Sequence, residues 1–225
     1  MTVVRATDIG EEVIEVPPGN PQRLAGVVVA NGGVATFDQL ADALWEGEEL
    51  GTTRARLRNV LMRLRKAVGE IVVRTPNGVR LAPGVDCDLV EFDRLAGDAL
   101  TYLRTDPEMS GQMAEQAVEI ADGPLLSDFE YDEWALVVRR RAEQQLLALL
   151  DLLSVQAQDD GDLGRAQQLA ERALRLDRYT DSRYVRLADL LTLDGRVAAA
   201  IAVLAEANEV AGELGGSGSD DVQRR

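Results

Sequence analysis

The chain has 225 residues, of which 46% are hydrophobic and 4% aromatic, and its 24 basic and 39 acidic side chains give a formal net charge of −15. It contains no histidine and one cysteine, Cys87, which excludes imidazole catalysis, His- or Cys-based metal clusters and an intramolecular disulfide. No apolar run approaches the roughly 18 residues of a membrane span, and the N-terminus lacks the pattern of a signal peptide. We therefore expect a cytoplasmic protein with no membrane contact.

The charge is distributed unevenly along the chain. Residues 1–84 hold ten basic and ten acidic side chains, whereas residues 85–225 hold 14 basic and 29 acidic ones. Six of the basic residues lie in the segment Thr52–Val68, which has no acid. Because most of the protein repels polyanions, any nucleic-acid binding is expected to be confined to this segment and its neighbours.

The first elements predicted are short strands and an apolar helix. The β-prone runs Val3–Ala6 and Glu12–Val16 predict a hairpin or a sheet edge. Asn20 then reads as the cap of a helix over Pro21–Asn31, with proline at the first helical position, and Gly32 ends it.

A second helix is predicted to begin after Thr36. Gln39 follows three residues later, which is the spacing of a capping box, and Leu40 and Leu44 belong to an apolar face. Residues 47–51 are then predicted to form a turn, made acidic by Glu46, Glu48 and Glu49.

The basic segment Thr52–Val68 is the third predicted helix, capped by Thr52 or Thr53. Helical spacing gathers its apolar residues on one arc: Leu57, Val60, Leu61, Leu64, Ala67 and Val68. The rest of its surface is basic. By itself the segment fits two interpretations, a helix that enters the DNA major groove or a solvated, arginine-rich surface helix.

A β-hairpin follows the basic helix. Ile71–Arg74 and Val79–Leu81 are β-prone, and Thr75–Gly78 contains the Asn-Gly pair typical of tight turns. Three helices followed by a hairpin is the layout of a winged helix, in which the third helix enters the major groove and the hairpin contacts the DNA backbone. A simple edge ribbon is the alternative for the hairpin.

The second half of the sequence is predicted to be helical. Amphipathic segments run over about 89–104, 108–121, 130–158, 163–176, 180–193 and 197–213. Gly161 and Ala166 recur 34 residues later as Gly195 and Ala200, which is the tetratricopeptide period and is typical of stacked helix pairs that bind proteins or dimerise. The low-complexity residues 215–225 are predicted to be a disordered tail.

Two features at the start of the third of these helices are interpreted as structural. The carboxylates Glu130, Asp132 and Glu133 lack His or Cys neighbours and read as a solvated helix start, not a site. Trp134 is expected to anchor its helix by packing.

An ordered set of residues across both halves carries a family resemblance: residues 42–45, 57–69, 79–86, 88–92, Trp134, 172–177, Tyr184 and 195–196. On these residues the sequence resembles the SARP-type bacterial transcriptional activators over about residues 10–215. The resemblance implies a mainly α protein, with a winged helix-turn-helix domain over 1–85 and a tetratricopeptide-like bacterial transcriptional activator domain over 86–214. It also implies double-stranded DNA binding, dimers on DNA and recruitment of RNA polymerase. This chain departs from many members in its acidic 46–49 turn and in a wing with only two basic residues.

The first hypothesis is therefore a DNA-binding transcription regulator. Residues expected to meet base edges are Arg54, Arg58, Asn59, Met62 and Lys66. Residues expected to hold phosphates are Arg56, Arg63, Arg65, Arg74 and Arg80.

The alternative hypothesis is a protein-interaction adaptor, in which the helical repeats bind a partner and the winged helix is a packing module. An enzyme is not expected, because no nucleophile with a base, metal site or P-loop is present in the sequence. We expect no cofactor and no bound metal.

Overall fold

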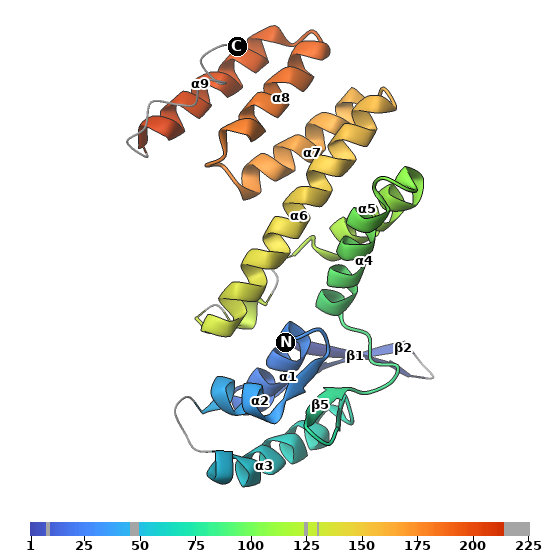
Figure 1. The fold of residues 1–225 in the computed structure, drawn as a ribbon, viewed down its shortest axis with the longest axis vertical. Helices are drawn as coiled ribbons and strands as arrows, with labels where there is room; N and C mark the ends of the chain where they lie inside the picture. Colours follow the sequence, from blue (N-terminus) through green and yellow to red (C-terminus); the bar gives the residue numbers. More distant parts are fainter. Residues whose placement is uncertain (8–9, 46–49, 124–125, 130, 214–225) are drawn as a thin grey trace. The chain divides into compact units, whose positions relative to one another are not determined.

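The computed structural model describes residues 1–7, 10–45, 50–123, 126–129 and 131–213. The chain divides into two compact units, Met1–Arg94 with Ile120–Ala142, and Leu95–Glu119 with Glu143–Arg225. Most of the described residues are helical, and the strands occur near the N-terminal end of the chain (Figure 1). None of the described helices is both long enough and apolar enough to cross a bilayer.

The first unit contains two small antiparallel sheets and the first helices. Its elements in order are β1 (Thr2–Thr7), β2 (Gly10–Glu15), α1 (Asn20–Ala30), β3 (Val34–Thr36), α2 (Phe37–Leu44), α3 (Leu50–Val68), β4 (Val72–Arg74) and β5 (Gly78–Leu81). Strands β1 and β2 form the predicted N-terminal hairpin, and β5 lies between β3 and β4 in the second sheet. Strand β3 was not predicted, because three residues after a glycine pair give no readable alternation.

The predicted N-terminal cap is confirmed for α2 and is wrong for α1 and α3. The capping box of α2 is confirmed, since Thr36 Oγ1 accepts from the backbone N–H of Gln39 at 3.2 Å and the Thr36 N–H donates to Gln39 Oε1 at 2.8 Å. Asn20 lies inside α1, after Gly19 at φ 84°, and does not cap it. Helix α3 begins at Leu50, so Thr53 is part of the helix, where it is buried.

One apolar core joins these elements. Leu24 of α1, Leu40 of α2, Leu64 of α3 and Val79 of β5 are all fully buried and belong to the same cluster. Four side chains from four different elements thus fix the position of α3 against α1, α2 and the sheet.

The segment before and within the start of α6 packs back onto α1. The rings of Phe129 and Trp134 lie 4.9 Å apart and tilted by 54°, and a Cβ on Gly26 of α1 would come within 2.5 Å of Phe129. The packing role predicted for Trp134 is confirmed. The interpretation of Asp132 as solvated is wrong, because its side chain is 19% exposed and forms an ion pair with Arg23. Glu130 lies outside the described residues.

The second half of the chain is helical, as predicted. Its described helices are α4 (Asp88–Tyr102), α5 (Pro107–Ile120), a short 3-10 turn (Ser127–Phe129), α6 (Glu133–Asp159), α7 (Leu163–Leu176), α8 (Asp181–Leu193) and α9 (Val197–Glu213). Helix α8 packs against both α7 and α9. The predicted tail, 215–225, lies outside the described residues.

The 34-residue repeat corresponds to equivalent positions in two successive helix pairs. Gly161 and Gly195 both have positive φ, 81° and 78°, in the turns before α7 and α9. Ala166 and Ala200 are buried at the same place in the following helices, with exposures of 0% and 4%. The repeated glycine therefore supplies a left-handed turn residue, and the repeated alanine supplies a small buried residue. The prediction of tetratricopeptide-like helix pairs is confirmed.

Candidate nucleic-acid interface

Helix α3 is held in the first unit by a single apolar stripe. Leu57, Val60, Leu64 and Val68 recur at helical spacing and are between 0% and 5% exposed. Thr53 extends the stripe toward the N-terminus. Two members of the predicted arc are less buried than expected, since Leu61 is half-buried and Ala67 is exposed. The stripe is thus narrower than predicted, and more of the helix surface faces solvent.

The face opposite the stripe is exposed and carries the predicted base-reading residues. At about 100° per residue, Asn59, Met62 and Lys66 point most directly away from the core. All three are exposed, and 63% of Met62 is accessible. The side chain of Arg54, which is also predicted to meet bases, lies outside the described residues.

Further arginines border this face along the helix. Arg56, Arg58, Arg63 and Arg65 are all exposed. Arg65 Nη2 lies 3.3 Å from Glu70 Oε1, with both side chains more than half exposed. An exposed pair of this kind contributes little to stability, so the Arg65 guanidinium can exchange Glu70 for a phosphate at small cost. Helix α3 has no acidic residue of its own.

The wing is the β4–β5 ribbon, and Gly78 is the residue that lets it pack. Gly78 is not in the left-handed region that the Asn-Gly signal suggests. Instead, a Cβ at this position would lie 2.0 Å from the Ala35 carbonyl oxygen of β3. The glycine is therefore needed for the close approach of β3 to β5, the central strand of the three-stranded sheet. Whether the β4–β5 ribbon contacts DNA or is a simple edge ribbon stays a prediction.

The two arginines of the wing are held differently. The Arg74 guanidinium lies 5.7 Å from the ring centroid of Phe37, the first residue of α2. Arg80 Nη1 donates to the carbonyl oxygen of Leu81 at 3.1 Å. In the ladder Arg74 pairs with Val79 and Arg80 pairs with Val73, so strand alternation places the arginines on opposite faces of the ribbon. The two guanidinium groups therefore start from different sides of the β4–β5 ribbon.

The described residues bring α3 and the wing into one unit, as the sequence predicted. Helix α3 and β5 contribute Leu64 and Val79 to the same core, and Figure 1 draws them side by side. The sequence did not indicate the contact between Phe37 and Arg74, because the two residues are far apart in the chain and neither belongs to a motif. The acidic turn 46–49 lies outside the described residues.

No group of three or more metal-ligating side chains occurs among the residues described. The candidate site is the exposed surface of α3, because its side chains are basic or polar and the helix carries no acidic residue.

The described residues thus combine a winged helix-turn-helix unit with a stack of tetratricopeptide-like helix pairs. Residues 87–225, more than half of the chain, match the family model of the bacterial transcriptional activator domain. The chain belongs to this family, which consists of transcriptional regulators, not enzymes. No curated protein matches the chain.

Among solved structures, the chain is similar to Mycobacterium tuberculosis EmbR, described in complex with a low affinity phosphopeptide. The TM-score is 0.72 at 18% identity, and the match covers 94% of this chain and 59% of that chain. The likeness shows the fold, and this chain spans little more than half of the longer protein. The family match and this fold together confirm the predicted resemblance to SARP-type activators and the predicted fold class.

Proposed function

We propose that the protein is a sequence-specific, double-stranded DNA-binding activator of transcription whose α3 enters the major groove. The observation that carries the proposal is the outer surface of α3, where exposed Arg, Lys, Asn and Met side chains surround a helix with no acid. The major groove of B-DNA admits one α-helix, and its base edges pair with Arg and Asn.

The candidate positions on α3 and the wing divide into two roles. We assign to base edges Arg54, Arg58, Asn59, Met62 and Lys66, of which Asn59, Met62 and Lys66 point most directly away from the buried stripe. Those bordering the groove walls and on the wing are assigned to phosphates: Arg56, Arg63, Arg65, Arg74 and Arg80. Arginine suits both roles because its planar fork forms two parallel hydrogen bonds.

The net charge of −15 sets the expected mode of binding. A protein with this charge gains little from non-specific attraction to DNA, so complexes depend on the local fit of α3. Two copies on adjacent half-sites add their contacts, and we therefore include a homodimer on DNA in the proposal.

Activation requires a second contact, which we assign to RNA polymerase. The bacterial transcriptional activator domain family supports this role, because residues 87–225 belong to it. Transcription in vitro from a promoter carrying the bound site should rise with the full chain, and the rise should disappear when α3 is altered.

The direct test of DNA binding starts from fragments that the full chain retains from a genomic DNA library, followed by fluorescence anisotropy on the best fragment. The double variant Arg58→Ala, Asn59→Ala should bind this fragment at least about tenfold more weakly, since each good base contact discriminates by about 1–3 kcal/mol. Unchanged affinity in a folded variant would contradict the assignment of α3.

A matched control removes the same residue types elsewhere. Arg175 and Asn208 are exposed on α7 and α9, so Arg175→Ala, Asn208→Ala makes an equal change in charge and amide content away from α3. This control should bind as the wild type does. Arg63→Gln should weaken binding to every sequence alike and lower the salt slope by about one.

The alternative, a protein-interaction adaptor, is favoured by the acidic balance of residues 85–225, where 29 acidic side chains oppose 14 basic ones. A gel shift with fragmented genomic DNA at low salt separates the two functions. Absence of any shifted species at low salt favours the adaptor.

A further inference from the structure

A pocket in the second unit contains an arginine with no carboxylate partner. The pocket lies among α6, α7 and α8, has a volume of about 230 Å³, and is lined by Asp151, Val155, Ala170, Ala173, Ser182, Arg183 and Arg186. Its volume exceeds that of an apolar cavity of about 150 Å³ that holds a benzene ring. A short acid or one side chain of a polypeptide therefore fits inside.

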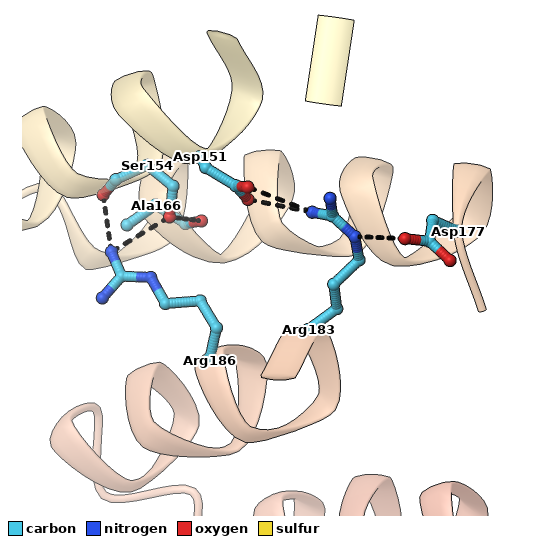
Figure 2. Close-up of polar contacts among 6 residues, drawn as sticks. All are labelled: Asp151, Ser154, Ala166, Asp177, Arg183 and Arg186. Carbon is cyan, nitrogen blue, oxygen red and sulfur yellow. Dashed lines mark hydrogen bonds and ion pairs between the residues drawn. The ribbon is translucent and has the colours of Figure 1, made fainter. Parts of the chain in front are cut away.

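Arg183, the other arginine of the pocket, is paired with two carboxylates. Its Nη1 lies 3.0 Å from Asp151 Oδ1 and 3.3 Å from Oδ2, and its Nε lies 3.1 Å from Asp177 Oδ2 (Figure 2). The Arg183 side chain is 12% exposed, whereas that of Asp151 is 54% exposed. The charge of Arg183 is thus satisfied within the chain, and Asp151, one of its two partners, is more than half exposed.

Arg186, one helical turn further along α8, has only neutral partners. Its Nη1 donates to Gln158 Oε1 at 2.6 Å, and its Nη2 donates to the carbonyl oxygen and the hydroxyl of Ser154 at 3.0 and 3.1 Å. Among the described residues no carboxylate lies within ion-pair distance of this half-buried guanidinium. Charges removed from water are normally paired, so Arg186 is a cation without its counter-ion.

The guanidinium of Arg186 is also held in place before any ligand arrives. Figure 2 shows it directed to Ser154 on α6. The Ser154 hydroxyl donates in turn to the carbonyl oxygen of Ala166 on α7 at 3.1 Å and is buried. A cation fixed by three neutral acceptors loses little further freedom on binding an anion, which favours affinity.

We propose that this pocket binds the carboxylate group of an acidic ligand, received by Arg186 beside Ser182 and Arg183. The lining contains two guanidinium groups and one carboxylate, and the Arg186 guanidinium is the one that no carboxylate contacts, so the pocket suits a monoanionic group. A phosphate dianion is disfavoured, because Asp151 and the nearby Asp177 repel a second negative charge. The carboxylate comes from a small free acid or from an acidic side chain of a polypeptide. The site does not depend on DNA binding by α3.

The test uses the full chain and follows the arginine Nε–H signals by NMR during titration. The probes are succinate, inorganic phosphate, the peptide acetyl-Ala-Asp-Glu-Ala-amide and its neutral counterpart acetyl-Ala-Asn-Gln-Ala-amide. We expect saturable shifts with an acidic probe and none with the neutral peptide. Succinate binding as tightly as the peptide supports the site and identifies a small acid, whereas binding of the peptide alone supports it and identifies a polypeptide.

Two variants change the affinity in opposite directions. Arg186→Gln should weaken binding of the acidic probe at least about tenfold, the effect of losing one charge-assisted contact, while Arg175→Gln on the exposed surface of α7 should leave it unchanged. Asp151→Asn removes the internal competitor for Arg183 and should tighten binding by about threefold or more. A misfolded protein cannot produce this gain.

Three results overturn the proposal: no saturable shift with either acidic probe at tens of millimolar, equal binding of the neutral peptide, or equal affinities of the Arg186→Gln and Arg175→Gln variants. Binding of inorganic phosphate in preference to both carboxylate probes also overturns it.

Discussion

The guanidinium of Arg74 lies over the ring of Phe37, 5.7 Å from its centroid. Phe37 is the first residue of α2, and Arg74 is the last residue of β4. The contact therefore ties the wing to the helix that precedes α3, and it orients a cation predicted to hold a DNA phosphate.

Phe37→Leu keeps an apolar side chain at this position but removes the aromatic face. If the ring positions Arg74 for DNA, affinity for all sequences should fall by about two- to fivefold, which corresponds to about 0.5–1 kcal/mol. Fluorescence anisotropy on specific and unrelated duplexes measures the change. In an Arg74→Ala background the same substitution should have no further effect, and an undiminished effect there would show that Phe37 acts through packing.

Gly78→Ala should destabilise the first unit. The added Cβ would meet the Ala35 carbonyl oxygen at 2.0 Å and Thr36 Cα at 2.8 Å, and neither backbone atom can move without opening the β3–β5 ladder. We expect a loss of more than about 2 kcal/mol in the free energy of unfolding, measured by urea denaturation with Trp45 fluorescence. Wild-type stability in this variant would show that the strands approach less closely.

Gly97→Ala is the matched control for that substitution. Gly97 lies within α4, and no atom lies within 4 Å of the position its Cβ would take. The same change should therefore stabilise the protein by about 0.5–1 kcal/mol, because alanine is the better helix former.

Gly26→Ala tests the packing of residues 127–134 onto α1. Helix propensity alone predicts a gain in stability, whereas the added Cβ would lie 2.5 Å from Phe129 and 2.8 Å from Trp134. We expect the steric effect to win, with a loss of about 1–3 kcal/mol and a changed native emission of Trp134 in a Trp45→Phe background. A stabilised variant with unchanged emission would contradict this packing.

Asp177 should make the second unit sensitive to acid. Burial raises the pKa of this carboxyl, but hydrogen bonds from Thr180 and Arg183 outweigh burial and hold the pKa below its ordinary value of 3.8. The pKa of Asp177 is thus lower in the folded protein than in the unfolded chain. Its ionised carboxylate therefore stabilises the fold fully above about pH 4, and this stabilisation is lost as the pH falls through the folded pKa.

The variant Asp177→Asn should accordingly lose on the order of 1 kcal/mol at pH 7 relative to wild type. This difference should shrink as the pH is lowered from 4 toward 2. Thermal unfolding over that range measures it, and Asp160→Asn makes the same substitution at an exposed position as the control. A difference that does not depend on pH would mean that Asp177 acts only through packing at the end of α7.

Local sequence patterns determined most of the helices of this protein and the face of α3. Three such patterns each involve only a few neighbouring residues: the capping box of Thr36 and Gln39, the turn glycine Gly161 and the apolar period of α3. The structure that each one forms therefore follows from the local sequence. The boundary between the two domains at residue 85 and the division of α3 into base and phosphate contacts remain predictions.

Tertiary structure decided the features that join distant segments. Four features depend on residues far apart in the chain. They are the pairing of β3 with β5, the stacking of Arg74 on Phe37, the ion pair of Arg23 with Asp132 and the isolation of Arg186 in its pocket. No local propensity encodes such contacts, because they form only when the apolar faces of several elements share one core. The sequence by itself therefore identified a basic helix on a winged fold, and only the packed structure showed what holds its wing and where an unpaired cation lies.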